Sequence, residues 1–180
     1  MKNLKDILSQ VAILQLFGQT NIEVNALVFD SRKILQQDIF VALKGVSVDG
    51  HAYIAKAISL GATVIVCETL PKEIHKGITY VQVADANSAL AVMAANYYKH
   101  PSQKLCLIGI TGTNGKTTIA SLLYQLFQKA GYKVGLLSTV KILVDTVEFK
   151  ATHTTPDSVT INHYLDAMVK ACVEYCFVEV

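Results

Sequence analysis

The chain has 180 residues, of which 52% are hydrophobic and 17% charged, so it can bury a core and does not belong to the disordered class. Its formal net charge of +2 is too small to indicate binding to nucleic acid or to a membrane surface. No apolar run reaches the length of about 18 residues that a membrane-spanning helix needs, and residues 1–8 lack the apolar segment of a signal peptide. These features predict a soluble, cytoplasmic protein without membrane insertion, built as one large or two small domains.

The first half of the chain predicts a small α/β domain. Short strands are expected at residues 26–30 and 38–43, a helix at 51–60, and further strands at 62–67 and 80–83. Asp85 is placed to cap a helix that runs to about residue 99. The polar stretch 98–104 then includes Pro101, which indicates a domain boundary and divides the chain into residues 1–100 and 101–180.

The second half alternates strands and helices in the manner of a parallel sheet. Strands are predicted at residues 104–110, 133–137 and 175–180, and helices at 116–130 and 157–171. A hairpin is predicted at residues 140–150, around Asp145 and Thr146. The last strand stops on an apolar residue without a turn. We therefore expect the sequence to be a fragment of a longer protein, whose sheet has an open edge.

The four cysteines lie in apolar stretches, at Cys67, Cys106, Cys172 and Cys176. No histidine or second cysteine pair completes the ligand set of a zinc site around them. We therefore interpret them as buried, reduced thiols, in agreement with a cytoplasmic location.

Residues 109–118 carry the strongest chemical signal, in the sequence GITGTNGKTT between a predicted strand and a predicted helix. Glycines let backbone N–H groups turn toward one point, and the helix N-terminus adds its positive dipole end there. Lys116 supplies a positive charge for phosphates, and the Thr117 hydroxyl can ligate Mg²⁺. The pattern departs from G-x-x-x-x-G-K-[ST] because Ile110 replaces the first glycine. The alternative is a plain strand–helix turn, but a lysine in the first helical turn opposes the dipole unless an anion is present.

Weaker signals lie elsewhere in the sequence, and each allows two interpretations. Ser31 and Arg32 follow a strand, and from the residues alone they favour a turn with a solvated arginine. Residues 153–155, His153, Thr154 and Thr155, precede a helix, where hydroxyls bind anionic oxygens or cap the helix. Glu179, at the carboxyl end of a strand, is either an oxygen ligand for Mg²⁺ or a solvated side chain.

Three separated blocks resemble the Mur ligase family, and the resemblance covers essentially the whole chain. They are DSRK with the following DIFVAL and DGH at residues 30–51, GTNGKTT at 112–118, and ATHTTPD at 151–157. The middle block is shared with folylpolyglutamate and cyanophycin synthetases, whereas the first and third are more specific. The resemblance explains the missing first glycine of the phosphate loop.

The resemblance implies a small α/β uridine-nucleotide-binding domain in residues 1–100, followed by the start of a P-loop-type, parallel-sheet ATPase domain in 101–180. It implies a ligase that uses ATP and Mg²⁺ and works through an acyl phosphate in peptidoglycan synthesis. The amino acid added to UDP-N-acetylmuramoyl-L-alanyl-D-glutamate would be meso-diaminopimelate or L-lysine. A monomer is expected.

The resemblance also assigns site residues. Lys116 and Glu179 would be catalytic, with Thr117 and Glu179 as metal ligands. In the family, the glutamate is followed by Ser-Ser-His, which is absent here. The phosphate-binding residues would be Gly112, Thr113, Asn114, Gly115, Lys116, Thr117 and Thr118. The UDP-sugar substrate would contact Ser31, Val46, Ser47, Val48, His153, Thr154 and Thr155.

Three alternative functions remain open at this point. The chain could be a non-catalytic module that binds a UDP-sugar peptide. It could also be another Mur-type ligase, or a P-loop kinase or small NTPase, although a P-loop enzyme of that kind explains only residues 105–140.

Overall fold

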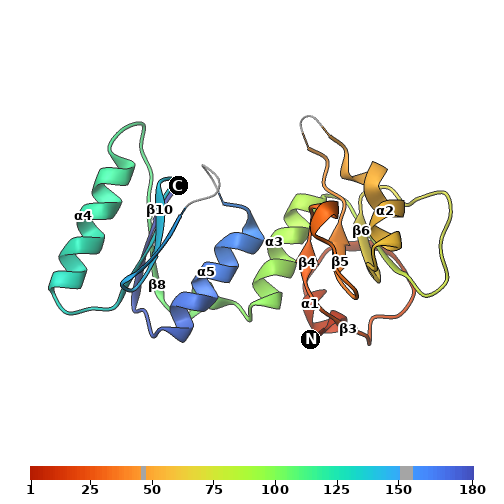
Figure 1. The fold of residues 1–180 in the computed structure, drawn as a ribbon, viewed down its shortest axis with the longest axis horizontal. Helices are drawn as coiled ribbons and strands as arrows, with labels where there is room; N and C mark the ends of the chain where they lie inside the picture. The colour runs from red at the N-terminus through yellow and green to blue at the C-terminus, as the bar shows by residue number, and fades with distance from the viewer. Residues whose placement is uncertain (46–47, 151–155) are drawn as a thin grey trace. The chain divides into compact units, whose positions relative to one another are not determined.

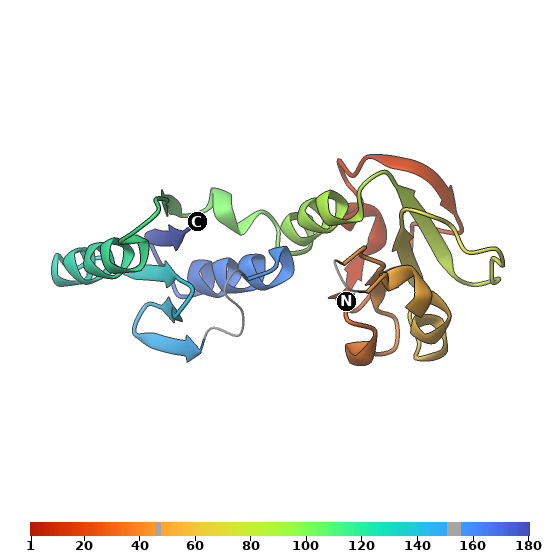
Figure 2. The same cartoon turned by 90° about the horizontal axis from the view of Figure 1, so that it is seen from above.

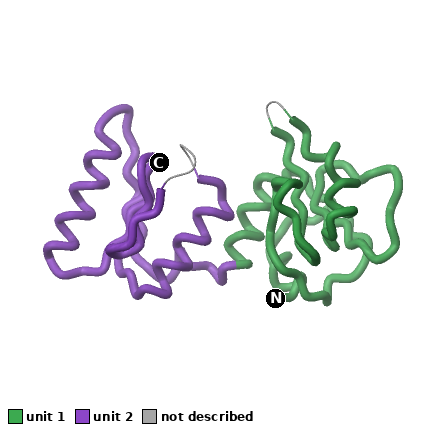
Figure 3. Tube along the Cα trace, viewed as in Figure 1, with its two compact units in different colours: residues 1–97 green, residues 98–180 purple. Residues whose placement is uncertain are grey.

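The computed structural model describes residues 1–45, 48–150 and 156–180, which form two compact units (Figures 1 and 3). Unit 1 comprises residues 1–97 and unit 2 residues 98–180, so the division falls at the start of the polar stretch 98–104. Each unit contains a five-stranded sheet with parallel strands and packed helices, which confirms the α/β class. None of the helices in the described part is long and apolar enough to cross a membrane.

Unit 1 is built on a sheet with the strand order β2-β7-β6-β5-β4. The strands are β2 (Ile13–Phe17), β4 (Leu27–Val28), β5 (Ile39–Val41), β6 (Val64–Cys67) and β7 (Thr79–Val83). All neighbours are parallel except β2, which runs antiparallel to β7. Every residue of β5 and β6 is buried, as expected for parallel strands that are covered on both faces.

Five helical segments accompany this sheet: α1 (Leu4–Ile7), η1 (Ser31–Lys33), η2 (Gly50–Tyr53), α2 (Ile54–Ser59) and α3 (Ala86–Tyr97). Ile54 and Ala57 of α2 pack in one cluster with Phe40 and Ile65 of the sheet. The helix predicted at 51–60 is thus a 3-10 turn followed by a short α-helix. Asp85 caps α3 as predicted, because its Oδ1 accepts from the backbone N–H groups of Asn87 and Ser88.

The first 25 residues hold elements that the sequence did not predict. Besides α1 and β2, a two-stranded antiparallel ribbon pairs β1 (Lys2–Asn3) with β3 (Glu23–Val24). These pieces have two to five residues, too few for a periodic pattern to show. In β2 the apolar side chains of Leu14 and Phe17 are exposed, so the strand lacks the expected alternation.

Unit 2 has a sheet with the strand order β11-β10-β9-β12-β8. The parallel part consists of β8 (Cys106–Ile110), β12 (Tyr175–Glu179) and β9 (Val134–Leu137). The predicted hairpin, β10 (Lys141–Val144) and β11 (Val147–Lys150), forms the edge opposite to β8 (Figure 2). Its turn contains Asp145 at φ +51°, a left-handed conformation that aspartate tolerates.

Two helices cover opposite faces of this sheet (Figure 1). The helix α4 (Lys116–Lys129) packs Ala120 and Tyr124 on a face that includes Phe177, while α5 (Ser158–Lys170) packs Leu165 and Met168 on the face that includes Cys176. The turn η3 (Pro101–Gln103) precedes β8. The side chains of β12 therefore alternate between two apolar layers, and the strand lies between two parallel neighbours.

The prediction of four buried thiols is wrong for two of them. All four cysteines are free, but Cys106 and Cys172 are exposed, whereas Cys67 and Cys176 are buried. Cys106 opens the edge strand β8, and Cys172 occupies a left-handed turn at φ +60° after α5. Burial raises the pKa of Cys67 to about 11 and that of Cys176 to about 12.

Candidate functional site

The candidate site lies where the parallel strands of unit 2 reach their carboxyl ends. Strand β8 ends at Ile110, and the loop 111–115 leads directly into α4. The register of the sheet places Glu179 opposite Ile110, so the end of β12 lies beside the start of the loop. The carboxyl edge of a parallel sheet is the usual place for a ligand site in such folds.

Two glycines shape the loop. Gly112 has φ +150° and Gly115 has φ +78°, in a region that side chains rarely adopt. A Cβ atom built on Gly115 would meet no atom nearer than Ile119 Cδ1 at 3.9 Å, so backbone conformation rather than space requires the glycine. Gly115 is the N-cap of α4 and makes no side-chain capping bond, which leaves amide donors of the first turn for a ligand.

Lys116 is the first residue of α4, and its ammonium group lies over the loop. Its Nζ donates a hydrogen bond to the carbonyl oxygen of Gly112, at 2.8 Å. The positive charge therefore stands at the loop, and its role in binding phosphate stays a prediction.

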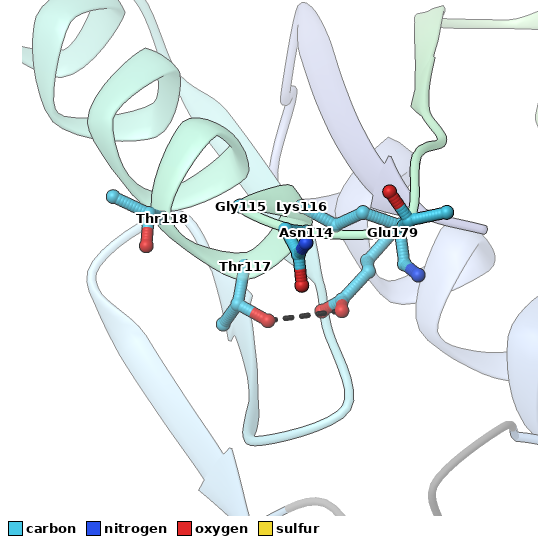
Figure 4. A pocket seen from close by; sticks show the side chains of 7 residues that line it. Asn114, Gly115, Lys116, Thr117, Thr118 and Glu179 are labelled. Carbon is cyan, nitrogen blue, oxygen red and sulfur yellow. Dashed lines mark hydrogen bonds between the residues drawn. The ribbon is translucent and has the colours of Figure 1, made fainter.

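Glu179 is held by two threonines, one in α4 and one in the segment after β9. Figure 4 shows the bond from Thr117. Its Oε1 accepts from Thr117 Oγ1 at 2.9 Å, and its Oε2 accepts from the backbone N and the Oγ1 of Thr139, both at 3.2 Å. Burial opposes ionisation, but the bonds from Thr139 and Thr117 and the charge of Lys116 outweigh it and hold the Glu179 pKa below its ordinary value. The group is thus an oriented carboxylate at neutral pH.

Thr139 was missed by the sequence analysis. It follows Ser138 just after the carboxyl end of β9, which is the parallel neighbour of β12. A hydroxyl in that position was a usable signal, because ends of neighbouring parallel strands meet at one edge. The predicted alternative, a merely solvated Glu179, is not what the structure shows.

The loop and Glu179 line one open pocket of about 220 Å³ (Figure 4). The lining residues are Thr113, Asn114, Gly115, Lys116, Thr117, Thr118 and Glu179. Gly112 lies beside them as the partner of Lys116.

A divalent cation fits the chemistry of the oxygen donors in this pocket. A hydroxyl and a carboxylate meet at the pocket, and hard oxygen donors of this kind suit Mg²⁺. No group of three or more His, Cys, Asp or Glu side chains gathers for a metal in residues 1–45, 48–150 and 156–180. Mg²⁺ would therefore take its other ligands from phosphate oxygens and water, as it commonly does in nucleotide sites.

The residues predicted to contact a UDP-sugar lie mainly in unit 1. Ser31 is buried at the start of η1, directly after Asp30. Asp30 accepts from the backbone N–H of Arg32 and from its guanidinium, and these bonds lower the Asp30 pKa to about 2. The turn is therefore an Asx turn with an exposed Arg32, as the residues alone favoured. Val48 is 54% exposed, so its side chain is accessible.

Several predicted contacts lie outside the described residues. They are Val46 and Ser47 in unit 1, and His153, Thr154 and Thr155 in unit 2. The cap of α5 is supplied by Asp157, which accepts from the backbone N and the Oγ1 of Thr160. Asp157 is therefore the N-cap of α5, and the role predicted for the two threonines lies outside the described residues.

Family models match both units. The model described as "Mur ligase middle domain" matches residues 110–180, and "Mur ligase family, catalytic domain" matches residues 23–98. The chain belongs to the Mur ligase family. Although the second description names a catalytic domain, the phosphate loop and Glu179 of this Mur ligase chain lie in the part matched by the first.

Two curated relatives carry the name UDP-N-acetylmuramoyl-L-alanyl-D-glutamate--2,6-diaminopimelate ligase. The relative from Cytophaga hutchinsonii is 49% identical over 98% of this chain and 37% of its own length. The relative from Bacteroides fragilis is 46% identical over 98% of this chain and 36% of its own length. This Mur ligase chain thus spans little more than a third of the relatives it matches.

Solved structures of Mur ligases share the fold. A structure with the same ligase name has a TM-score of 0.78 and 21% identity, over 99% of this chain and 36% of its own. MurF ligase from Thermotoga maritima, solved in complex with ADP, has a TM-score of 0.54 and 23% identity, over 87% of this chain and 32% of its own. At these identities the likeness supports the fold alone.

Proposed function

We propose that this chain is part of an ATP-dependent ligase that joins an amino acid to UDP-N-acetylmuramoyl-L-alanyl-D-glutamate. The observation that carries the proposal is the pocket in which the phosphate loop, the Thr117 hydroxyl and the Glu179 carboxylate meet. Family membership and the names of relatives at 46–49% identity support the reaction class. The same names favour diaminopimelate over L-lysine as the amino acid added.

An amide forms from a carboxylate at neutral pH only when the carboxylate is activated. In the proposed reaction, a substrate carboxylate oxygen attacks the γ-phosphorus of ATP, and ADP leaves. The amine of the amino acid then attacks the acyl phosphate, loses a proton and expels inorganic phosphate. Such phosphoryl transfer is accelerated mainly by positioning and by neutralising charge on the phosphate oxygens.

The residues of unit 2 suit the first step. The loop amides and the Lys116 ammonium would hold the β- and γ-phosphates, and Thr117 with Glu179 would hold Mg²⁺. The bound metal would neutralise phosphate charge. Thr139 would keep the Glu179 carboxylate directed into the pocket. We propose ATP as the nucleotide because the chain belongs to a family of ligases and carries this loop.

We assign the nucleotide-sugar to unit 1, with Ser31 and Val48 among its contacts, joined by Val46 and Ser47. His153, Thr154 and Thr155 would contact the muramoyl portion. The assignment is supported by the sequence blocks at residues 30–51 and 151–157. We further propose a monomer that acts in the cytoplasm, where both nucleotides are available.

A binding experiment tests the two assignments separately. The 180-residue chain is titrated calorimetrically with UDP-N-acetylmuramoyl-L-alanyl-D-glutamate and, in a second series, with ATP and Mg²⁺. We expect both to bind, without sustained turnover, because the chain spans 36–37% of the relatives whose name states the reaction. Binding of ATP without the nucleotide-sugar would instead favour a P-loop NTPase or kinase.

A further inference from the structure

His51 makes three hydrogen bonds that fix its protonation state. Its Nε2 lies 3.0 Å from the backbone N of Glu68 and 3.2 Å from that of Thr69, while its Nδ1 lies 2.6 Å from Asp49 Oδ1. A backbone N–H can only donate, so Nε2 must be an unprotonated acceptor. The ring proton then sits on Nδ1 and is donated to Asp49. His51 is thus a neutral imidazole in a single tautomer, and its side chain is only 14% exposed.

The ring joins a tight loop to the end of a buried strand. Lys44 and Asp49 form an isolated antiparallel bridge, and inside it the Gly45 N–H donates to Val48 O at 3.0 Å. At the base, the Gly50 N–H donates to Leu43 O at 2.8 Å. A Cβ atom on Gly50 would come within 2.7 Å of that same oxygen, so the base is closely packed.

Glu68 provides a second tether at the same place. Its Oε2 lies 2.9 Å from Lys44 Nζ, and its Oε1 accepts from the backbone N–H of Ala86, the first residue of α3. Its carbonyl oxygen accepts from Gln82 Nε2 at 3.0 Å. The loop is therefore connected through His51 and Glu68 to β6, β7 and the start of α3.

We propose that His51 is a positioning residue for nucleotide-sugar binding. It holds the loop that presents Val48, and it does so only as a neutral imidazole. The proposal rests on the function proposed for unit 1, and it uses the described loop residues Lys44, Gly45, Val48 and Asp49. Protonation of Nε2 would set a donor against two donating N–H groups, so both bonds would be lost. Nucleotide-sugar binding then weakens at acidic pH, while ATP binding in unit 2 does not.

The charged groups that face His51 come from two segments, the loop of Lys44 and Asp49 and the end of β6. Asp49 faces Nδ1, and bonds from the His51 backbone and ring hold the Asp49 pKa below its ordinary value. Glu68 and Lys44 form the adjoining ion pair. Asp49 and Glu68 thus lie near the ring with negative charge, and Lys44 lies near it with positive charge.

The test is calorimetric titration of the 180-residue chain with UDP-N-acetylmuramoyl-L-alanyl-D-glutamate between pH 5.5 and 8. The ligand's carboxylates and phosphodiester groups remain ionised in this range. We expect the dissociation constant to rise about tenfold at pH 5.5, as for the loss of one or two hydrogen bonds. His51→Gln should bind several-fold more weakly at pH 8 and show no such pH dependence. The control His75→Gln, at an exposed position of the same unit, should keep the wild-type profile.

Four results would overturn the proposal. One is a flat pH profile of the wild-type chain, and another is an unchanged profile in His51→Gln. The third needs no variant: ¹⁵N NMR of the His51 ring at pH 8 should show a proton on Nδ1, and a proton on Nε2 contradicts the geometry. A wild-type chain that binds no nucleotide-sugar at any pH, yet shows the Nδ1 proton, overturns the function proposed for unit 1 and the positioning role with it.

Discussion

The hydroxyl of Thr117 donates a 2.9 Å hydrogen bond to the carboxylate of Glu179, although 62 residues separate the two along the chain. Thr117 lies in the first turn of α4, and Glu179 ends β12. The parallel pairing of β8 with β12 therefore brings an oriented carboxylate into one pocket with the candidate phosphate loop.

Lys116→Ala should weaken ATP binding to the 180-residue chain by about ten- to a hundredfold, the usual effect of losing one charge-assisted hydrogen bond, roughly 1.5–3 kcal/mol. Binding of the nucleotide-sugar should not change. Isothermal titration with each ligand measures both effects. Lys129→Ala, in the last turn of the same helix, is the matched control. Equal ATP affinities of Lys116→Ala and the control would remove Lys116 from the site.

Gly115→Ala should destabilise the loop through its backbone. The added methyl group has room, with Ile119 Cδ1 at 3.9 Å, but φ +78° costs an alanine about 1 kcal/mol or more. We expect a lower free energy of unfolding in urea and weaker ATP binding. Gly131→Ala, which follows α4 at φ +92° with open space around it, is the control for stability. It should lose similar stability but keep its affinity for ATP.

Glu179→Gln should flatten the acid side of the pH–stability curve. The folded-state pKa of Glu179 is lowered, so its ionisation contributes stability above the unfolded-state value of 4.5, and this contribution is lost as pH falls through the folded-state pKa. Urea unfolding between pH 3 and 7 measures the effect. The difference in unfolding free energy between wild type and variant should shrink below about pH 4.5. A difference that stays constant over this range would contradict the hydrogen-bonded carboxylate.

The thiols should divide into two reactive and two protected groups. Cys106 and Cys172 are exposed, whereas Cys67 and Cys176 are buried and their pKa values are raised to about 11 and 12. A thiol reagent at pH 8 should modify the first pair quickly in the folded chain and all four in denaturant. Peptide mass spectrometry identifies the labelled residues. Rapid labelling of Cys176 in the folded chain would contradict the packing of β12 beneath α5.

The sequence predicted best the parts whose determinants are local. The β8–loop–α4 unit carries its glycines, lysine and hydroxyl in one continuous segment, and Asp85 caps α3 from its own turn. Contacts that depend on strand pairing were harder to predict from the sequence. Thr139 contacts Glu179 only because β9 and β12 are neighbours. His51 contacts the backbone of Glu68, 17 residues further along the chain, only because the chain folds back into β6, which Glu68 follows. The ribbon of β1 and β3 joins residues about twenty positions apart, and no local sequence pattern predicts it.

The most direct test of the central claim is phosphate release from a protein of the relatives' full length that carries these 180 residues. We predict that release from ATP requires Mg²⁺ and UDP-N-acetylmuramoyl-L-alanyl-D-glutamate together with diaminopimelate, at one phosphate for each amide formed. Lys116→Ala should abolish it. Phosphate release that continues at the same rate without the nucleotide-sugar, or a phosphorylated product that forms without any need for the amine, would contradict the account.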